Sequence, residues 1–174
     1  KWFRLSADQG VADAQYNLGD VYYRGEGVAE DHKEAVKWYR LAADQEDPDA
    51  QFSLGDAYYS GEGVAEDKEE AVKWYRLAAD QGHAPAQYNL GICYRDGEGV
   101  AEDKEEAAKW FRLAAEQGHV DAQFNLGICY RDGVGVEEYS AEAQKWFRLA
   151  AAQGDAEAEA QVDLRLIASD EDLF

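Results

Sequence analysis

The chain is poor in several residue types whose presence would point to particular classes of protein. Its 174 residues include no methionine, two prolines and two cysteines, and its 17 lysines and arginines are outnumbered by 37 aspartates and glutamates. No stretch approaches the roughly 20 consecutive apolar residues that a membrane-spanning helix needs. No basic segment followed by an apolar one opens the chain either. We therefore expect no insertion into a membrane.

The shortage of basic residues gives the chain a formal net charge of −20 at pH 7. Such a surface repels the phosphates of nucleic acids and of anionic membranes, which argues against both as partners. It keeps the protein soluble and would speed its encounter with a partner of basic character. Apolar residues still make up 46% of the chain, so a substantial core is available.

What the sequence does contain is a repeated segment. Residues 35–43 recur as residues 71–79, 107–115 and 143–151, and residues 1–7 resemble residues 37–43. A fixed period of 20–50 residues is typical of a solenoid of stacked units. The five tryptophans stand 36 residues apart, at Trp2, Trp38, Trp74, Trp110 and Trp146. Because the chain opens inside a copy and lacks an initiator methionine, we expect it to be an excerpt of a longer protein.

Each period predicts two helices joined by a glycine-containing loop. Helical spacing of apolar residues over 14–23 indicates the first helix, with Gly25 as its C-cap. Asp31 followed by Glu34 three residues later indicates the N-terminus of the second helix, over residues 34–44.

Glycine recurs inside the first helix of each repeat, where it costs about 1 kcal/mol relative to alanine. Its positions are Gly19, Gly55, Gly91 and Gly127. A compensating close approach of a neighbouring helix or of a bulky ring is expected. For the first repeat we predict that Gly19 faces Trp38 and Tyr22.

These motifs carry a resemblance. Ala-x-x-x-Leu-Gly-x-x-Tyr, then Gly-x-Gly-Val, then Ala-x-x-Trp-[Phe/Tyr]-x-x-Ala-Ala over 36 residues resembles the Sel1-like repeat (SLR), a relative of the tetratricopeptide repeat. The resemblance covers residues 1 to about 155. It implies an all-α, right-handed superhelical solenoid of antiparallel helix pairs that acts as an adaptor or scaffold for other proteins.

The predicted organisation is a single solenoid over residues 1–174. Residues 1–13 would hold the second helix of a truncated repeat, followed by full repeats at 14–49, 50–85, 86–121 and 122–157. Residues 158–174 would form a C-terminal capping helix and an acidic tail. Two departures from the pattern are local: Glu46-Asp47-Pro48 replaces a glycine turn, and Tyr139 stands where aspartate caps the other second helices, so Ser140 is predicted to take over the cap.

Several motifs that could carry chemistry have simpler explanations. Cys93 and Cys129 replace small apolar residues one repeat apart, and neighbouring helices lie about 8–10 Å apart. A disulfide needs Cα atoms within roughly 7 Å, so buried free thiols are expected. The Gly-x-Gly loops follow helices rather than strands, which disfavours a phosphate site. Acidic loops and scattered histidines lack metal-ligand spacing, so we expect no metal and no cofactor.

Positions that vary on an otherwise constant first helix are the candidates for partner contact. Aspartate in the first two repeats gives way to isoleucine in the last two, and tyrosine gives way to arginine. In the related tetratricopeptide arrays this helix lines a concave groove, so the resemblance implies a peptide-binding face. The candidate residues are Tyr16, Asp20, Tyr23, Arg24, Phe52, Asp56, Tyr59, Tyr88, Ile92, Arg95, Asp96, Phe124, Ile128 and Arg131. For Tyr16 and its equivalents, simple packing between repeats is an equally good interpretation.

Three functions remain open at this point. The first is a non-enzymatic module that binds a peptide or protein segment. The second is a structural spacer, or an array that associates end to end with further copies. The third is an enzyme, since some members of the resembled family have been linked to β-lactam hydrolysis. No serine here is followed three residues later by the lysine that such chemistry uses elsewhere, so no enzymatic activity is expected.

Overall fold

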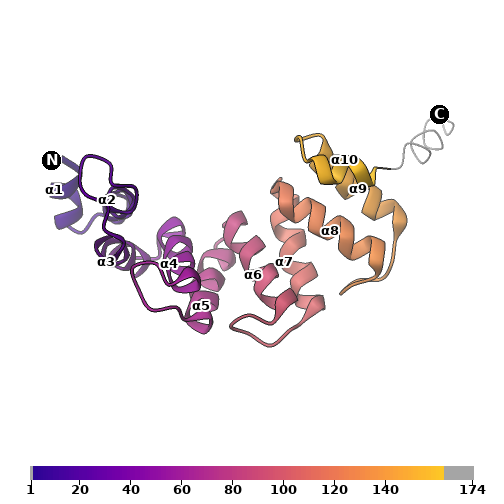
Figure 1. Ribbon diagram of the computed structural model, residues 1–174, viewed down its shortest axis with the longest axis horizontal. Helices are drawn as coiled ribbons and strands as arrows, with labels where there is room; N and C mark the ends of the chain where they lie inside the picture. Colours follow the sequence, from indigo (N-terminus) through magenta and orange to yellow (C-terminus); the bar gives the residue numbers. More distant parts are fainter. Residues whose placement is uncertain (1, 163–174) are drawn as a thin grey trace. The chain divides into compact units, whose positions relative to one another are not determined.

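The computed structural model describes residues 2–162, with side chains from residue 4 onward, and all regular structure in them is helical. The chain divides into two compact units, Lys1–Glu102 and Asp103–Phe174. The helices of the first unit are α1 (Trp2–Asp8), α2 (Ala12–Arg24), α3 (His32–Ala43), α4 (Pro48–Ser60), α5 (Lys68–Asp80) and α6 (Ala84–Asp96). Those of the second are α7 (Lys104–Glu116), α8 (Val120–Asp132), α9 (Ser140–Ala151) and α10 (Ala156–Gln161) (Figure 1).

Within each unit, helices that follow one another along the chain pack side by side (Figure 1). In the first unit α2 packs on α3, α3 on α4, α4 on α5 and α5 on α6; in the second, α7 packs on α8 and α8 on α9. The predicted all-α, solenoid-like arrangement of helix pairs is confirmed. The right-handed superhelix and the single continuous array stay predictions.

The two caps predicted in the first repeat, Gly25 and Asp31, are confirmed. The Asp31 carboxylate accepts a hydrogen bond from the backbone N–H of Glu34 at 3.0 Å. Gly25 ends α2 in the left-handed region, with φ of 67°. A side-chain acceptor at the N-cap and a glycine after the last turn satisfy backbone groups that a helix leaves unpaired.

The first helix of each full repeat begins two residues earlier than predicted, at residues 12, 48, 84 and 120. At three of these four starts the preceding residue caps the helix with its side chain, whereas Val11 before α2 makes no such bond. Asp47 accepts from the N–H of Ala50 at 2.8 Å, and Nδ1 of His83 accepts from the N–H of Ala86 at 3.1 Å. His119 caps α8 in the same way. These two histidines are therefore half-buried capping residues.

The glycine of the first helices meets a different ring from the one predicted. A Cβ added at Gly19 would lie 2.6 Å from ring carbons of Tyr39, one position after Trp38. Gly55 faces Tyr75 in the same way within the first unit, and Gly127 faces Phe147 within the second. Tyr39 is buried while Trp38 is half-buried. The prediction of close packing is confirmed, and the choice of Trp38 was wrong.

A buried glutamine in each first helix ties it to the helix before. Gln15 Nε2 donates to the backbone oxygen of Ala7 at 3.1 Å, and Gln51 Nε2 donates to that of Ala43 at 3.3 Å. Gln45 Nε2 in turn donates to Gln15 Oε1 at 2.7 Å. Since a buried amide needs partners, these bonds fix how one repeat stacks on the next.

The second glycine of the loop after α4 is packed against the neighbouring repeat. Gly63 has φ of 74°, and a Cβ there would lie 2.2 Å from the backbone oxygen of His32 in the first turn of α3. Gly27, at the same position one repeat earlier, has a similar φ of 76° and nothing within 4 Å. The Gly63 loop is therefore an inter-repeat contact as well as a turn.

The start of α9 and the bounds of the C-terminal helix differ from the prediction. Tyr139 is the N-cap of α9 and makes no side-chain capping bond, and Ser140 is the first helical residue, so Ser140 does not replace the missing aspartate. The C-terminal helix begins at Ala156 and ends at Gln161. The remainder of the predicted capping helix and tail, residues 163–174, lies outside the described residues.

Both cysteines are buried free thiols, as predicted, and burial raises the pKa of Cys93 to about 11. Among residues 2–162, no helix is both long enough and apolar enough to cross a membrane.

Candidate functional site

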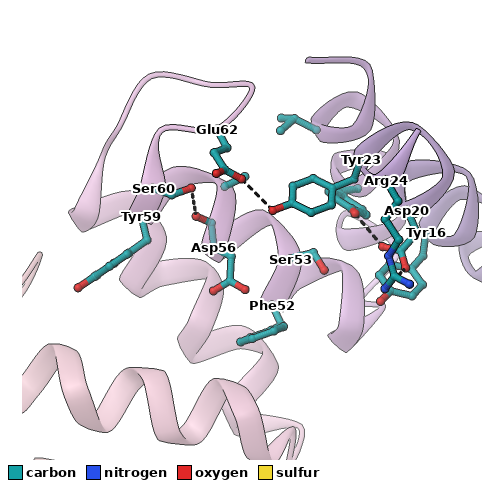
Figure 2. Close-up of a pocket in the computed structure, with 13 residues that line it drawn as sticks. Tyr16, Asp20, Tyr23, Arg24, Phe52, Ser53, Asp56, Tyr59, Ser60 and Glu62 are labelled. Carbon is teal, nitrogen blue, oxygen red and sulfur yellow. Dashed lines mark hydrogen bonds and ion pairs between the residues drawn. The ribbon is translucent and has the colours of Figure 1, made fainter. Parts of the chain in front are cut away.

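A pocket of about 460 Å³ opens between α2 and α4 of the first unit. We call it the α2–α4 pocket. In Figure 2 the Tyr23 ring extends from α2 toward α4, where its hydroxyl meets Glu62 of the loop after α4. Its wall combines aromatic rings with acids, and Arg24 is its one cationic residue. The lining residues are Tyr16, Asp20, Tyr23, Arg24, Val36, Tyr39, Phe52, Ser53, Asp56, Ala57, Tyr59, Ser60 and Glu62.

A second pocket, of about 390 Å³, adjoins the first on the side of α6. We call it the α4–α6 pocket. It shares Asp56 and Tyr59 with the α2–α4 pocket. Its other lining residues are Tyr75, Tyr88, Asn89, Ile92, Cys93 and Arg95. The two hollows therefore follow one another along the faces of three successive first helices.

The structure brings most of the predicted residues together. The α2–α4 pocket holds seven of the fourteen candidates and the α4–α6 pocket a further three. Asp96 lines neither pocket: it binds both Nε and Nη2 of Arg95, at 2.7 and 2.8 Å. Phe124, Ile128 and Arg131 belong to α8 in the other unit, where Arg131 binds Asp132 and Gln161.

Two of the candidate tyrosines, Tyr23 and Tyr59, already have partners within the chain. Tyr23 Oη donates to Glu62 at 2.8 Å, and Tyr59 Oη donates to Glu98. Each bond runs from one repeat to the loop of the next. The bond to Glu98 raises the pKa of the Tyr59 phenol well above its usual range. These rings are held in fixed positions at the rim of the pockets, so they form part of the scaffold as well as of the surface.

Tyr16 and Phe52 lie one turn before Asp20 and Asp56. They fit both interpretations of the sequence, namely packing between repeats and contact with a partner. Tyr16 lies 5.9 Å from Tyr39 and Phe52 lies 6.0 Å from Tyr75, measured between ring centroids. These are ordinary packing contacts. Both Tyr16 and Phe52 nevertheless stay half-buried and line the α2–α4 pocket.

Part of the divergence between repeats has a structural cause that the sequence analysis missed. Tyr39 Oη donates to Asp20 at 2.8 Å, and Tyr75 Oη donates to Asp56 at 2.6 Å. Where isoleucine replaces the aspartate, at residues 92 and 128, phenylalanine replaces the tyrosine, at residues 111 and 147. A buried phenol needs an acceptor and a phenyl ring does not. The paired substitution in the printed sequence is the signal that could have revealed this.

Asp20 and Asp56 occupy equivalent positions but have different electrostatic surroundings. Asp20 forms an ion pair with Arg24 at 3.2 Å. In the next repeat Ser60 replaces the arginine, and its hydroxyl donates to the backbone oxygen of Asp56 at 2.9 Å. Burial raises the pKa of Asp56, and the hydrogen bonds from Tyr75 and Asn89 do not offset that effect.

Ser60, which lines the α2–α4 pocket, donates its hydroxyl proton to the backbone oxygen of Asp56. In the described part of the chain, no three residues among histidine, cysteine, aspartate and glutamate come close enough together to hold a metal ion.

Comparison with known sequences and structures places this geometry in context. A sequence profile described as the Sel1 repeat matches residues 1–11, 12–47, 48–83, 84–119 and 120–155. Its repeat boundaries coincide with the observed starts of α2, α4, α6 and α8. No curated protein is similar enough to the chain to count as a relative.

Solved structures with the same repeat cover nearly the whole chain. One is c5321, a protective antigen of uropathogenic Escherichia coli strains with an SLR fold, at 45% identity and a TM-score of 0.88 over 90% of this chain. Another is a Sel1 repeat protein from Oxalobacter formigenes, at 38% identity and a TM-score of 0.86 over 92% of this chain. An immunity protein from Pseudomonas aeruginosa, Pa5087, matches at 26% identity with a TM-score of 0.58. The chain spans 34%, 46% and 58% of these three proteins respectively.

Proposed function

Because the chain belongs to the Sel1 repeat family, we propose that it is a non-enzymatic binding module that holds a peptide or protein segment on the faces of its first helices. The segment would have basic character. On the first unit it would lie along α2, α4 and α6, and the corresponding residues of α8 would serve the second unit.

One observation carries this proposal: two adjoining pockets share Asp56 and Tyr59 and together line three successive helices. An extended chain places alternate side chains on one face about 7 Å apart, so successive hollows suit it better than a compact ligand. Aromatic side chains held in place by the scaffold offer contact area with little loss of conformational entropy. Related repeat proteins include an antigen and an immunity protein, which is consistent with a binding role.

The acidic composition supports a partner of basic character. The α2–α4 pocket contains Asp20, Asp56 and Glu62 against the single cation Arg24. The whole chain carries a net charge of −20. Opposite charges on the partner would raise the association rate and select against acidic competitors.

Selection of displayed random peptides against the intact chain tests the proposal. Selected peptides should be enriched in basic residues. Their affinity should fall about tenfold or more on changing Phe52 and Tyr88 together to alanine, because aromatic anchors at the centre of an interface carry most of its energy. These two side chains line different pockets.

A matched control comes from exposed leucines of the second helices. Leu41 and Leu77 are both 47% exposed and line neither pocket. Changing both to alanine should leave peptide affinity within about twofold. If no peptide is enriched, or if both double variants bind equally well, the proposed face is wrong. Concentration-dependent light scattering without peptide binding would favour the assembly role instead.

A further inference from the structure

The wall between the two pockets contains one carboxylate whose charge the chain itself leaves unpaired. Asp56 lines both the α2–α4 and the α4–α6 pocket. Tyr75 Oη and Asn89 Nδ2 donate to it at 2.6 and 3.1 Å, and both bonds use the same oxygen, Oδ1. Among the described residues no cation binds Asp56, and Oδ2 accepts no hydrogen bond.

The equivalent carboxylate of the preceding repeat, Asp20, has a cation that Asp56 lacks. Asp20 has the same helix position and the same bond from a tyrosine, and Arg24 one turn later neutralises it at 3.2 Å. Ser60 occupies the position of that arginine in the second repeat. The other arginine nearby, Arg95, has its guanidinium bound by Asp96 through two nitrogens. Neither resident arginine therefore compensates Asp56.

Aromatic residues share the two pockets with this carboxylate. Phe52 lies one turn before Asp56 on α4, and Figure 2 shows the carboxylate on the side of the helix that carries this ring. Tyr59, Tyr75 and Tyr88 line the α4–α6 pocket beside it. A guanidinium group is planar, stacks on aromatic faces and pairs with a carboxylate through two parallel N–H bonds. Lysine has neither the plane nor the fork.

We propose that Asp56 and the aromatic residues that share its pockets form a subsite that takes an arginine side chain of the bound segment. The guanidinium would occupy, relative to Asp56, the role that Arg24 has relative to Asp20. This inference rests on the proposed function for the peptide as a whole, although the subsite can be tested without a peptide. Burial that raises the pKa of Asp56 is consistent with it, because a charge that is half-buried without a cation is relieved by one.

The probe is N-acetyl-arginine methylamide, titrated into the ¹⁵N-labelled chain and followed by NMR. Its neutral isostere, N-acetyl-citrulline methylamide, is the control ligand. We expect saturable shifts of the amides of residues 52–60 and 88–95, with a Kd on the order of 1 mM. Citrulline should give no saturable shift in these segments.

Three variants make the test specific. Asp56→Asn keeps the Oδ1 acceptor for Tyr75 but removes the charge, and Ser60→Arg supplies Asp56 with the internal partner that Asp20 has. Each should weaken arginine binding about tenfold or more. Asp80→Asn removes an exposed carboxylate of α5 that lines neither pocket; it is the charge-matched control and should leave arginine binding within about twofold. Thermal unfolding followed by circular dichroism verifies that each variant is folded.

Equal shifts with arginine and citrulline, no shift at roughly ten times the expected Kd, or unchanged binding by folded Asp56→Asn would each overturn the subsite. The outcome is separable from the proposed function. Displayed peptides that bind the face without needing arginine would leave the function standing and remove the subsite. Binding of the arginine probe without any selected peptide would leave the subsite standing and remove the proposed function.

Discussion

Tyr139 occupies the position at which Asp31, Asp67 and Asp103 cap their helices. It is 57% exposed and leaves the first turn of α9 without a side-chain acceptor. Tyr139→Asp should therefore stabilise α9 by about 1 kcal/mol, the usual value of such a cap. Hydrogen exchange of the Glu142 amide measures this directly, because it is the N–H that the new carboxylate would bind.

The control for that substitution removes an existing cap from another repeat. Asp31→Ala removes an existing cap and should destabilise α3 by a similar amount. If Tyr139→Asp leaves the exchange of Glu142 unchanged while Asp31→Ala speeds exchange at Glu34, the Tyr139 side chain has a stabilising contact that outweighs the missing cap.

His119 makes the cap of α8 depend on pH. Its Nδ1 accepts a hydrogen bond from the N–H of Ala122, which requires a neutral ring, and burial lowers the pKa of the imidazole. Because the folded-state pKa lies below the unfolded one, this contribution to stability is present above about pH 6.5 and is lost as the pH falls through the folded pKa.

His119→Asn keeps a capping oxygen and does not titrate. Relative to the wild type, this variant should gain stability in urea unfolding as the pH falls from about 7 to about 5. The comparison of the two proteins cancels contributions that they share, such as Asp56, whose raised pKa acts in the opposite direction. A stability difference that does not vary over this pH range would contradict the capping role of the neutral ring.

At the scale of elements, the loops after the first helices are more than linkers. Gly63 and Gly27 have nearly the same φ, so alanine should cost each about 1 kcal/mol through backbone strain. Only at Gly63 would the new Cβ overlap the backbone of α3. Gly63→Ala should therefore lower the free energy of unfolding by about 1–3 kcal/mol more than Gly27→Ala.

Urea unfolding of the two glycine variants gives that comparison. Gly27→Ala serves as the control, because it shares the turn geometry and lacks the inter-repeat contact. Equal destabilisation by the two variants would mean that the loop relaxes away from α3 without loss, and that the contact contributes little to stacking.

At the scale of the whole molecule, the net charge of −20 opposes compactness through self-repulsion. Added sodium chloride screens such repulsion, since the Debye length falls from about 10 Å at 0.1 M to about 3 Å at 1 M. The exposed ion pairs that salt weakens, such as Lys73 with Glu70 at 2.8 Å, contribute little. We expect the Tm to rise by roughly 2–4 °C between these salt concentrations, which corresponds to about 1 kcal/mol.

Removing acids provides the control for the charge effect. Asp80 and Glu116 stand in the last turns of α5 and α7, where a negative charge meets the negative end of the helix dipole. Changing them to asparagine and glutamine should raise the Tm at low salt and reduce its further increase with salt. A Tm that falls as salt is added would show that attractive pairs outweigh the net repulsion.

The sequence by itself determined the all-helical repeat, its period, the caps at Asp31 and Gly25, and the burial of Cys93. These features depend on local spacing or on chemistry confined to one or two turns, which a repeated sequence displays several times over. It also singled out most of the residues that line the pockets, because variation on a constant helix face is visible in the sequence.

The tertiary structure decided which groups meet across repeats. Tyr39 rather than Trp38 fills the space beside Gly19, since the two differ by one position and only the packing angle selects between them. Tyr23 and Tyr59 bind glutamates 39 residues away, a separation that no helical period encodes. Whether a carboxylate accepts a hydrogen bond from the next helix, as Asp20 does from Tyr39 and Asp56 from Tyr75, depends on distances between side chains of different helices. Those distances exist only once the helices are packed.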